Sequence, residues 1–392
     1  MPAATRIHYM DNLRALAMLA GVVFHAALAY SPLMRPFWPP ADAEGSLLVD
    51  ALAWFLHLFR MPLFFVVAGF FAGVLVDRRG LSGLFRSRCL HVLLPLLLFL
   101  PPVLASLHWL TGQAAITTAH PSPALAWLRG YIELHGAMPF APGWVHLWFL
   151  FYLMLFAVLA WVASALELGR LGDRLAALPP IVLPAALPML LAPALAWAGV
   201  PWPAPESFLP SLWALAFFGA YFALGYQAFR RPALLERLRP QSSWLLGGAV
   251  AAYAVLFWST GGFANAQPSP LRQLLHAALQ AYAGCWMTLW CLLAARRWLD
   301  GRSAAMRWLA DASYWVYLVH LPVLFAIQYR LLDLPMPWTA RFALSTVSTL
   351  VLSFASYQWL VRHTLVGRLL NGRQRDLLRM DAPAHAAREP LP

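Results

Sequence analysis

Two polar side chains, Arg14 and His25, lie in the first apolar stretch of the chain, with only uncharged residues between them. An ionisable group at membrane depth is costly unless it faces protein or water, so such groups are functional candidates. The eleven steps from Arg14 to His25 amount to roughly three helical turns, which puts both side chains on one face about 16 Å apart. The spacing predicts one buried polar track.

The pair suits acid–base chemistry on an anionic ligand. Asp11 lies three residues before Arg14, at helical spacing for an ion pair that orients the guanidinium. The guanidinium fork suits phosphate or carboxylate. A neutral imidazole at His25 can take a proton from a hydroxyl nucleophile near neutral pH. The structural alternative is that Arg14 reaches to the membrane interface and His25 bonds a carbonyl of another helix.

Four arginines follow the second apolar stretch, within eleven residues: Arg78, Arg79, Arg86 and Arg88. Such a concentration of guanidinium groups attracts a polyphosphate, for example the adenosine end of coenzyme A. Arg86 and Arg88 adjoin the next apolar stretch and are the better candidates for a donor site. The alternative is charge that only sets the orientation in the membrane.

Histidines and aromatic residues near other span ends add candidates. His57 and Arg60 lie in the second stretch, where a proline two residues after Arg60 predicts a break, and they serve either chemistry or the interface. His146 and Trp148 begin the fourth stretch. The tryptophan suits an interfacial belt, although a sugar platform uses the same residue type. His146 is placed to meet an acceptor outside the membrane.

A last polar set lies in the ninth stretch, where Ser313, Tyr317 and His320 follow i, i+4, i+7 spacing. Their hydroxyl and imidazole groups form one stripe on an otherwise apolar helix, and such a stripe should face the protein interior. Hydrogen bonding between helices is the structural alternative to a catalytic role.

The elements that must position these residues are membrane helices. Apolar residues make up 61% of the 392 residues and charged residues 11%, and the mean hydropathy is +0.63, far from the usage of soluble domains. Hydropathy predicts an all-α polytopic membrane helix bundle of about ten transmembrane helices. The predicted spans are residues 13–30, 52–76, 90–110, 145–163, 180–200, 212–229, 244–260, 274–295, 309–331 and 342–361.

The arginines predict the orientation of this bundle. All 28 basic residues are arginine, and 21 of them fall in alternate loops and the two chain ends. The positive-inside rule therefore puts both termini in the cytoplasm and explains the net charge of +12 without a nucleic-acid partner. A cleaved signal peptide is the alternative for the first stretch, but its removal would invert the arginine asymmetry.

The remaining features limit other classes of protein. Cys89, Cys285 and Cys291 form neither a disulfide framework nor a metal-ligand spacing, so neither a metal nor a permanently bound cofactor is expected. No convincing similarity between the halves supports an inverted-repeat transporter. Residues 1–372 are predicted to form one membrane domain, and the polar residues 373–392 a disordered cytoplasmic tail.

Five segments, in order along the predicted spans, resemble the acyltransferase-3 family of integral membrane acyltransferases. They are Arg14 with His25, residues 64–70, Arg86 with Arg88, residues 146–150 and residues 313–320. Within the family, residues 57–61 and 362–372 look most like the glucan biosynthesis protein C group, which attaches succinyl groups to periplasmic glucans. The resemblance covers nearly the whole chain.

The resemblance implies acyl transfer from a cytoplasmic acyl-CoA, succinyl-CoA or acetyl-CoA, to a hydroxyl of an extracytoplasmic glucan or other envelope carbohydrate. It implies a multi-pass protein of the bacterial inner membrane, with Arg14 and His25 as the essential pair and Arg86 with Arg88 at the donor. Ala68 stands where many members have serine, so a hydroxyl is lost there.

Some relatives carry a fused extracytoplasmic hydrolase-like domain that completes the transfer. We expect none in this chain, so its membrane domain or a separate periplasmic partner does that work. A transporter or flippase that moves an anionic or acylated solute with the same buried Arg and His is the competing class, and an accessory subunit without catalysis is a third. Consumption of acyl-CoA separates an enzyme from both.

Overall fold

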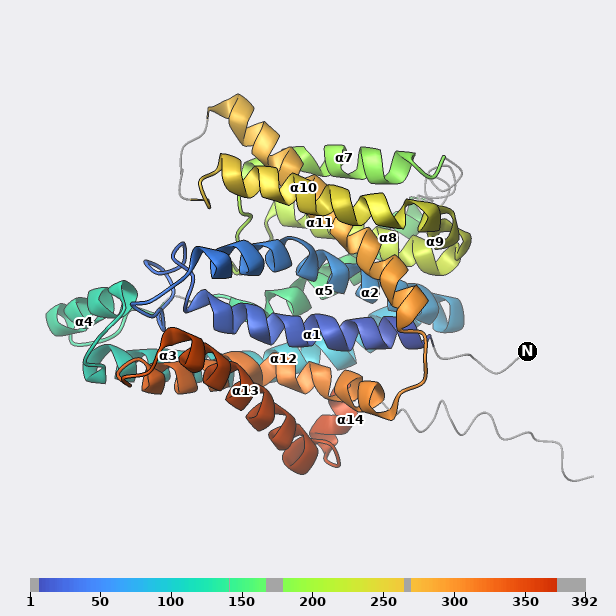
Figure 1. Cartoon of the computed structure of the whole chain (residues 1–392). Helices are drawn as coiled ribbons and strands as arrows, with labels where there is room; N and C mark the ends of the chain where they lie inside the picture. Colours follow the sequence, from blue (N-terminus) through green and yellow to red (C-terminus); the bar gives the residue numbers. More distant parts are fainter. Residues whose placement is uncertain (1–6, 141, 167–178, 264–268, 372–392) are drawn as a thin grey trace, which may run out of the picture.

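The computed structural model describes residues 7–140, 142–166, 179–263 and 269–371, which are helical and contain no strand. The predicted tail 373–392, and Arg6, Arg170 and Arg174 among the orienting arginines, lie outside the described residues. The long helices run roughly along one direction (Figure 1). They include α1 (His8–Leu28), α2 (Leu47–Arg88), α3 (Leu94–Thr117), α5 (Trp148–Ala165), α7 (Val182–Ala198), α8 (Leu212–Arg230), α10 (Ser242–Ser259), α11 (Pro270–Trp298), α12 (Ala304–Leu331) and α13 (Trp338–Ser356).

Shorter helices lie at the ends of this bundle. α4 (Pro123–His135) extends from one end, and α9 (Ala233–Leu238) and α14 (Leu365–Asn371) lie toward the other (Figure 1). By length and composition, eight helical segments of the described chain could cross a membrane. The predicted all-α membrane class is therefore confirmed. Ten spans were predicted, and the difference arises at two places: one segment, Leu47–Thr117, contains the second and third predicted spans, and α7, the fifth, has only 17 residues.

The chain reverses within α2, at Gly80. This residue has a φ of 68° and a ψ of −179°, a conformation that favours glycine. In a straight helix Arg88 and Ala68 would be about 30 Å apart, whereas the Arg88 guanidinium donates to the carbonyl of Ala68 at 3.3 Å. The two limbs of α2 are therefore antiparallel, and the second continues into α3. The break predicted at Pro62 is wrong, because α2 continues through that proline.

α1 and α12 are parallel neighbours. Near the start of α1, the Arg14 guanidinium donates to the carbonyl of Ala310 at 3.2 Å, and near its end Gln328 Nε2 donates to the carbonyl of Ala26 at 3.1 Å. Both helices thus run in the same direction. We call the end of the bundle where α1 begins the Arg14 end, and the end where α1 finishes the His25 end.

The principal helical limbs alternate in direction between these two ends. α7 belongs to the pattern, because Gln273 Nε2 donates to the carbonyl of Ala196 and Trp286 Nε1 to that of Pro184, so α7 runs opposite to α11. Once the reversal at Gly80 is counted, ten limbs of the described part of the chain alternate: α1, the first limb of α2, the second limb with α3, α5, α7, α8, α10, α11, α12 and α13.

α2 and α8 cross in direct backbone contact, because each has a glycine at the crossing. A Cβ on Gly69 would collide with the carbonyl of Phe222, and one on Gly225 with the carbonyl of Val66. Small residues let helices approach closely inside membranes. The crossing holds the part of α2 that carries His57 and Arg60.

Candidate active site

His25 of α1 and His320 of α12 form a hydrogen-bonded pair. His25 Nδ1 and His320 Nε2 lie 3.0 Å apart, and the ring centroids are 5.1 Å apart. The Nδ1 of His320 faces the carbonyl oxygens of Val316 at 3.1 Å and Tyr317 at 2.8 Å. A carbonyl only accepts hydrogen bonds, so this nitrogen carries a proton.

The proton on His320 Nδ1 assigns the tautomers of the pair. In neutral His320, Nε2 has no proton and accepts the hydrogen bond from the Nδ1–H of His25. Neutral His25 then has its lone pair on Nε2, the ring nitrogen that does not face His320. An imidazole with a fixed tautomer and a free lone pair meets the requirement for a general base.

His146 and Tyr317 extend the cluster. The His146 ring lies 5.1 Å from that of His320, and its Nε2 donates to the carbonyl of Leu318 at 3.3 Å, which leaves a buried Nδ1 without a partner. The Tyr317 hydroxyl donates to the carbonyl of His146 at 2.6 Å. His146 is buried, so it meets the His25–His320 pair and not the protein surface. In the described chain, no three His, Cys, Asp or Glu side chains are arranged to hold a metal.

The predicted polar stripe on α12 faces the protein interior. Ser313 is buried and its hydroxyl donates to the carbonyl of Ala310 at 2.7 Å. Because Arg14 donates to the same carbonyl, the stripe follows α1 from Arg14 to His25. Of its three members, only His320 touches His25 through a side-chain hydrogen bond.

Arg60 is a buried cation without a carboxylate beside it. Its relative exposure is 7%, its Nε has no hydrogen-bond partner, and no carboxylate of the described residues forms an ion pair with it. Its guanidinium carbon lies 4.6 Å from the centroid of the Phe24 ring, and Gly21 leaves the space that the guanidinium occupies. A cation–π contact of about 0.5–2 kcal/mol does not balance the several kcal/mol that burying a charge costs. The site therefore favours an anion, or negative charge that develops during a reaction, beside Arg60.

His57 lies on the same limb of α2. Its Nε2 donates to the carbonyl of Trp202 at 2.9 Å, and its Nδ1 is buried without a partner. Its ring packs on Trp202, with centroids 3.9 Å apart, and on Phe24 at 5.3 Å. The Phe24 ring therefore contacts both histidines, because the His25 ring centroid also lies 5.3 Å from it.

Arg14 and His25 both face α12, as the spacing predicted. Asp11 lies 3.4 Å from the Arg14 guanidinium, so the predicted ion pair is present. Arg14 bonds Ala310 and His25 bonds His320, ten residues further along α12. The two groups share a face and are separated along it, so Arg14 does not join the histidine cluster.

The four-arginine cluster divides into two kinds of residue. Arg78, Arg79 and Arg86 are exposed around the reversal at Gly80, near the Arg14 end. Arg88 is half-buried and bonds the carbonyl of Ala68 between the two limbs of α2. The cluster thus combines three solvent-facing cations with one that is held by the helix core.

Two aromatic positions differ from what the sequence indicated. Trp148 is 5% exposed and packs on Phe218 with ring centroids 5.2 Å apart, so it lies in the aromatic core and not in an interfacial belt.

Trp38, which sequence reasoning missed, belongs to the loop after α1. Its ring centroid lies 6.4 Å from that of His25, and the two ring planes are nearly parallel, at 10°. No helical period marks a loop residue, so only its residue type could have drawn attention to it.

Comparison with known proteins now identifies the family. Residues 7–358 match the family model of the acyltransferase-3 acyltransferase domain. The chain belongs to the acyltransferase-3 family. It is similar to the glucans biosynthesis protein C of Salmonella paratyphi A, at 27% identity over 82% of this chain and 83% of the relative, and to that of Salmonella heidelberg, at 28% identity over the same shares. No solved structure matches.

Family membership and the fold together make this chain a multi-pass membrane acyltransferase. The resemblance inferred from the five sequence segments is confirmed. The roles of the individual side chains stay predictions, and the geometry above decides which of them can act together: His25, His320 and Arg60 are near one another, whereas Arg14 and the exposed arginines lie toward the other end.

Proposed function

We propose that this acyltransferase moves an acyl group from a cytoplasmic acyl-CoA to a hydroxyl group of an extracytoplasmic glucan or a related envelope carbohydrate. The observation that carries the proposal is the His25–His320 pair with the unpaired Arg60 guanidinium beside it. The name of the relatives, glucans biosynthesis protein C, supports a glucan acceptor. Succinyl-CoA and acetyl-CoA are the candidate donors.

The proposed orientation has ten crossings of the bacterial inner membrane and both termini in the cytoplasm. The alternating direction of the ten limbs supports the count, and the arginines at the Arg14 end support the orientation by the positive-inside rule. The Arg14 end then faces the cytoplasm and the His25 end the outside. A donor from inside and an acceptor from outside reach the site from opposite ends.

The donor would enter from the Arg14 end. Arg78, Arg79 and Arg86 are exposed there and suit the phosphates of coenzyme A. About 16 Å of helix separates Arg14 from His25, a distance that an extended pantetheine arm can cover. Arg14 and Arg88 would steady the donor along this path, and the thioester would lie beside His25.

At the site, the reaction exchanges a thioester for an oxygen ester. His25 Nε2 takes the proton of the acceptor hydroxyl while the oxygen of that hydroxyl attacks the thioester carbon. The C–S bond then breaks, and the same proton passes to the departing sulfur, so the products are the ester and coenzyme A with a free thiol. Arg60 would stabilise the negative charge on the carbonyl oxygen in between, and one such donor contributes about 10² to 10³ in rate.

A second version gives His25 a covalent role. Its Nε2 attacks the thioester carbon and coenzyme A leaves as the thiolate; the acceptor hydroxyl then displaces the imidazole from the acyl group and gives up its proton, which neutralises the thiolate. Both versions require a free Nε2 on His25 and a hydrogen bond that holds Nδ1. A burst of acyl-enzyme in rapid-quench experiments without acceptor separates the second version from the first.

The test is His25→Ala in reconstituted proteoliposomes with acyl-CoA on one side and glucan on the other. Mass spectrometry of the glucan should show transfer reduced at least about 10²-fold, with unchanged protein yield and unfolding temperature. His135→Ala, at the exposed end of α4, is the control and should retain activity. A fully active His25→Ala, or solute flux without any consumption of acyl-CoA, contradicts the proposal.

A further inference from the structure

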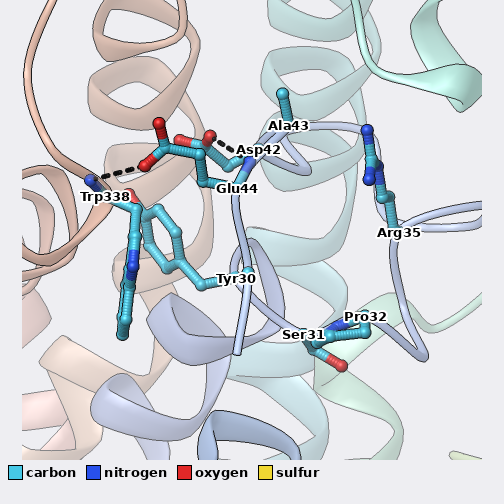
Figure 2. A pocket seen from close by; sticks show the side chains of 9 residues that line it. Tyr30, Ser31, Pro32, Arg35, Asp42, Ala43, Glu44 and Trp338 are labelled. Carbon is cyan, nitrogen blue, oxygen red and sulfur yellow. Dashed lines mark hydrogen bonds between the residues drawn. The ribbon is translucent and has the colours of Figure 1, made fainter. Parts of the chain in front are cut away.

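A pocket of about 570 Å³ opens at the His25 end, between the loop that follows α1 and the start of α13 (Figure 2). Tyr30 in its wall is five residues beyond His25, about 8 Å further in the direction of α1. Trp38 of the same loop lies parallel to the His25 ring. The pocket therefore lies beyond His25 in the direction of α1, at the end of the bundle opposite the exposed arginines.

The walls of the pocket combine aromatic rings with hydrogen-bonding groups. The Tyr30 and Trp338 rings have centroids 5.9 Å apart at an angle of 36°. Glu44, whose side chain is 57% exposed, presents its carboxylate next to Trp338, and Arg35 presents a guanidinium on the far side (Figure 2). An aromatic face beside planar polar groups suits the C–H face and the hydroxyl groups of a sugar ring.

Carboxylate and guanidinium groups lie side by side around the pocket. Asp42, whose side chain is 2% exposed, lies 3.2 Å from Arg341, and the same guanidinium lies 3.8 Å from Glu44. Burial raises the pKa of the Asp42 carboxyl, and the backbone N–H of Glu44 and the charge of Arg341 offset part of that shift. Among the residues that line the pocket, Arg35 is the one cation beside the Asp42 and Glu44 carboxylates. The pocket therefore has no excess of positive charge to attract phosphate, and a neutral ligand fits it best.

Hydrogen bonds fix the pocket before any ligand arrives. The backbone N–H of Glu44 donates to Asp42 Oδ1 at 2.9 Å, and the backbone N–H of Trp338 donates to Glu44 Oε2 at 3.3 Å (Figure 2). The backbone N–H of Asp42 donates to the carbonyl of Ala29 at 2.7 Å. The loop is thereby tied both to α1 and to α13, so little ordering is needed when a ligand binds.

We infer that this pocket is a saccharide subsite. It holds one neutral sugar unit against Trp338, while Glu44 and Arg35 hydrogen-bond to the hydroxyl groups of that unit. Neighbouring units of the same glycan then reach toward His25 past Trp38. The assignment of this subsite to the acceptor rests on the proposed function, whereas the binding of a saccharide here does not.

Binding can be measured without turnover. Purified full-length protein in detergent is titrated by calorimetry with laminaripentaose and maltopentaose, which are neutral glucan oligosaccharides, and with inositol hexaphosphate. We expect one of the oligosaccharides to bind the wild type and His25→Ala equally. Trp338→Ala should weaken this binding about tenfold, which corresponds to about 1.4 kcal/mol, and Glu44→Gln should weaken it as well.

The control is Trp258→Ala, which removes an 84% exposed tryptophan of α10 outside the pocket and should leave saccharide binding unchanged. Three results overturn the subsite: no binding of either oligosaccharide, saccharide binding that Trp338→Ala and Glu44→Gln leave intact, or binding of inositol hexaphosphate that these two variants weaken instead. An unfolding temperature in detergent equal to that of the wild type shows that Trp338→Ala is folded.

Turnover separates this inference from the proposed function. If His25→Ala abolishes transfer but Trp338→Ala leaves the KM for glucan unchanged, the assignment of the subsite to the acceptor is wrong and the proposed function stands. If Trp338→Ala weakens saccharide binding but the wild type consumes no acyl-CoA, the subsite stands and the proposed function is wrong. When both hold, Trp338→Ala raises the KM for glucan about tenfold and leaves the KM for acyl-CoA unchanged.

Discussion

Replacement of His320 tests whether the hydrogen bond to His25 matters for acyl transfer. In His320→Ala the Nδ1–H of His25 loses the side-chain acceptor that lies at 3.0 Å. An unsatisfied buried donor costs about 1–3 kcal/mol, and about 1.4 kcal/mol corresponds to a factor of ten in rate. We therefore expect kcat to fall about 5- to 160-fold, while the KM for acyl-CoA stays close to that of the wild type.

Two amide variants make this test specific to one nitrogen of the ring. His320→Gln places an amide oxygen near the position of Nε2, where it can accept the hydrogen bond from His25. His320→Asn instead mimics Nδ1, which faces the carbonyl groups of Val316 and Tyr317. Steady-state transfer of a radiolabelled acyl group to glucan should show that His320→Gln recovers most of the lost kcat and that His320→Asn does not.

The pH profile of kcat adds a reading that a purely structural role of His320 would not change. The acidic limb of the profile reports the base in the enzyme–substrate complex, and it should shift in His320→Ala and return in His320→Gln. Equal activity of the Gln and Asn variants, or an unaltered acidic limb in His320→Ala, would refute the assignment of the tautomers.

Two further predictions concern packing and the donor. Gly225→Ala should lower the free energy of unfolding by about 1–3 kcal/mol, because the new Cβ collides with the carbonyl of Val66. Gly247→Ala, on α10, is the control and should not lower it, because the space around Gly247 is open. Thermal unfolding in detergent measures both variants, and equal unfolding temperatures would contradict the tight crossing. Arg86→Ala should raise the KM for acyl-CoA only at low ionic strength, because salt screens exposed charges. Arg88→Ala should raise this KM at high ionic strength as well, because Arg88 is held between the limbs of α2. Kinetics at two salt concentrations tests both variants, and the same salt dependence in both would contradict the division of the arginine cluster.

Much of the fold could be predicted because the membrane restricts what a chain can do. Apolar stretches must be helices there, and arginines mark alternate loops, so the helical class followed from composition and spacing. The connection between the second and third predicted spans, at Gly80, is where the structure differs most from the prediction. Hydropathy separates the stretches on either side of it, but a single glycine with a positive φ lets the chain reverse with no loop at all.

Helical periodicity also predicted which groups share a face. The i, i+4, i+7 spacing on α12 placed His320 toward the interior, and the eleven-residue spacing on α1 placed Arg14 and His25 toward one neighbour. Periodicity could not say that the two faces belong to adjacent parallel helices, because that depends on the direction of every limb between them. The hydrogen bond between His25 and His320 spans 295 residues of sequence for this reason.

The sequence could not predict features that depend on which residues pack together in space or on the path of a loop. Arg60 looked like a residue at a span end, and its importance arises because no carboxylate of the described residues pairs with it inside the bundle. Trp148 suited a belt by residue type, yet it packs in the core. Trp38 and part of the pocket wall belong to the loop after α1, which the ion pair between Asp42 and Arg341, residues distant in sequence, ties to α13.

The residues that an acyl transfer across a membrane would need follow one another along α1 and directly after it. Arg14 lies near its start, His25 near its end, and Tyr30 of the pocket directly after it. Because α12 runs parallel to α1 and bonds it at both levels, the distance between the donor entrance and the base cannot vary without breaking these bonds. On the proposed orientation, the acyl group alone then has to pass from the inner to the outer side. Coenzyme A and the glycan can each stay on their own side, so the chemistry requires no alternating-access motion of the bundle.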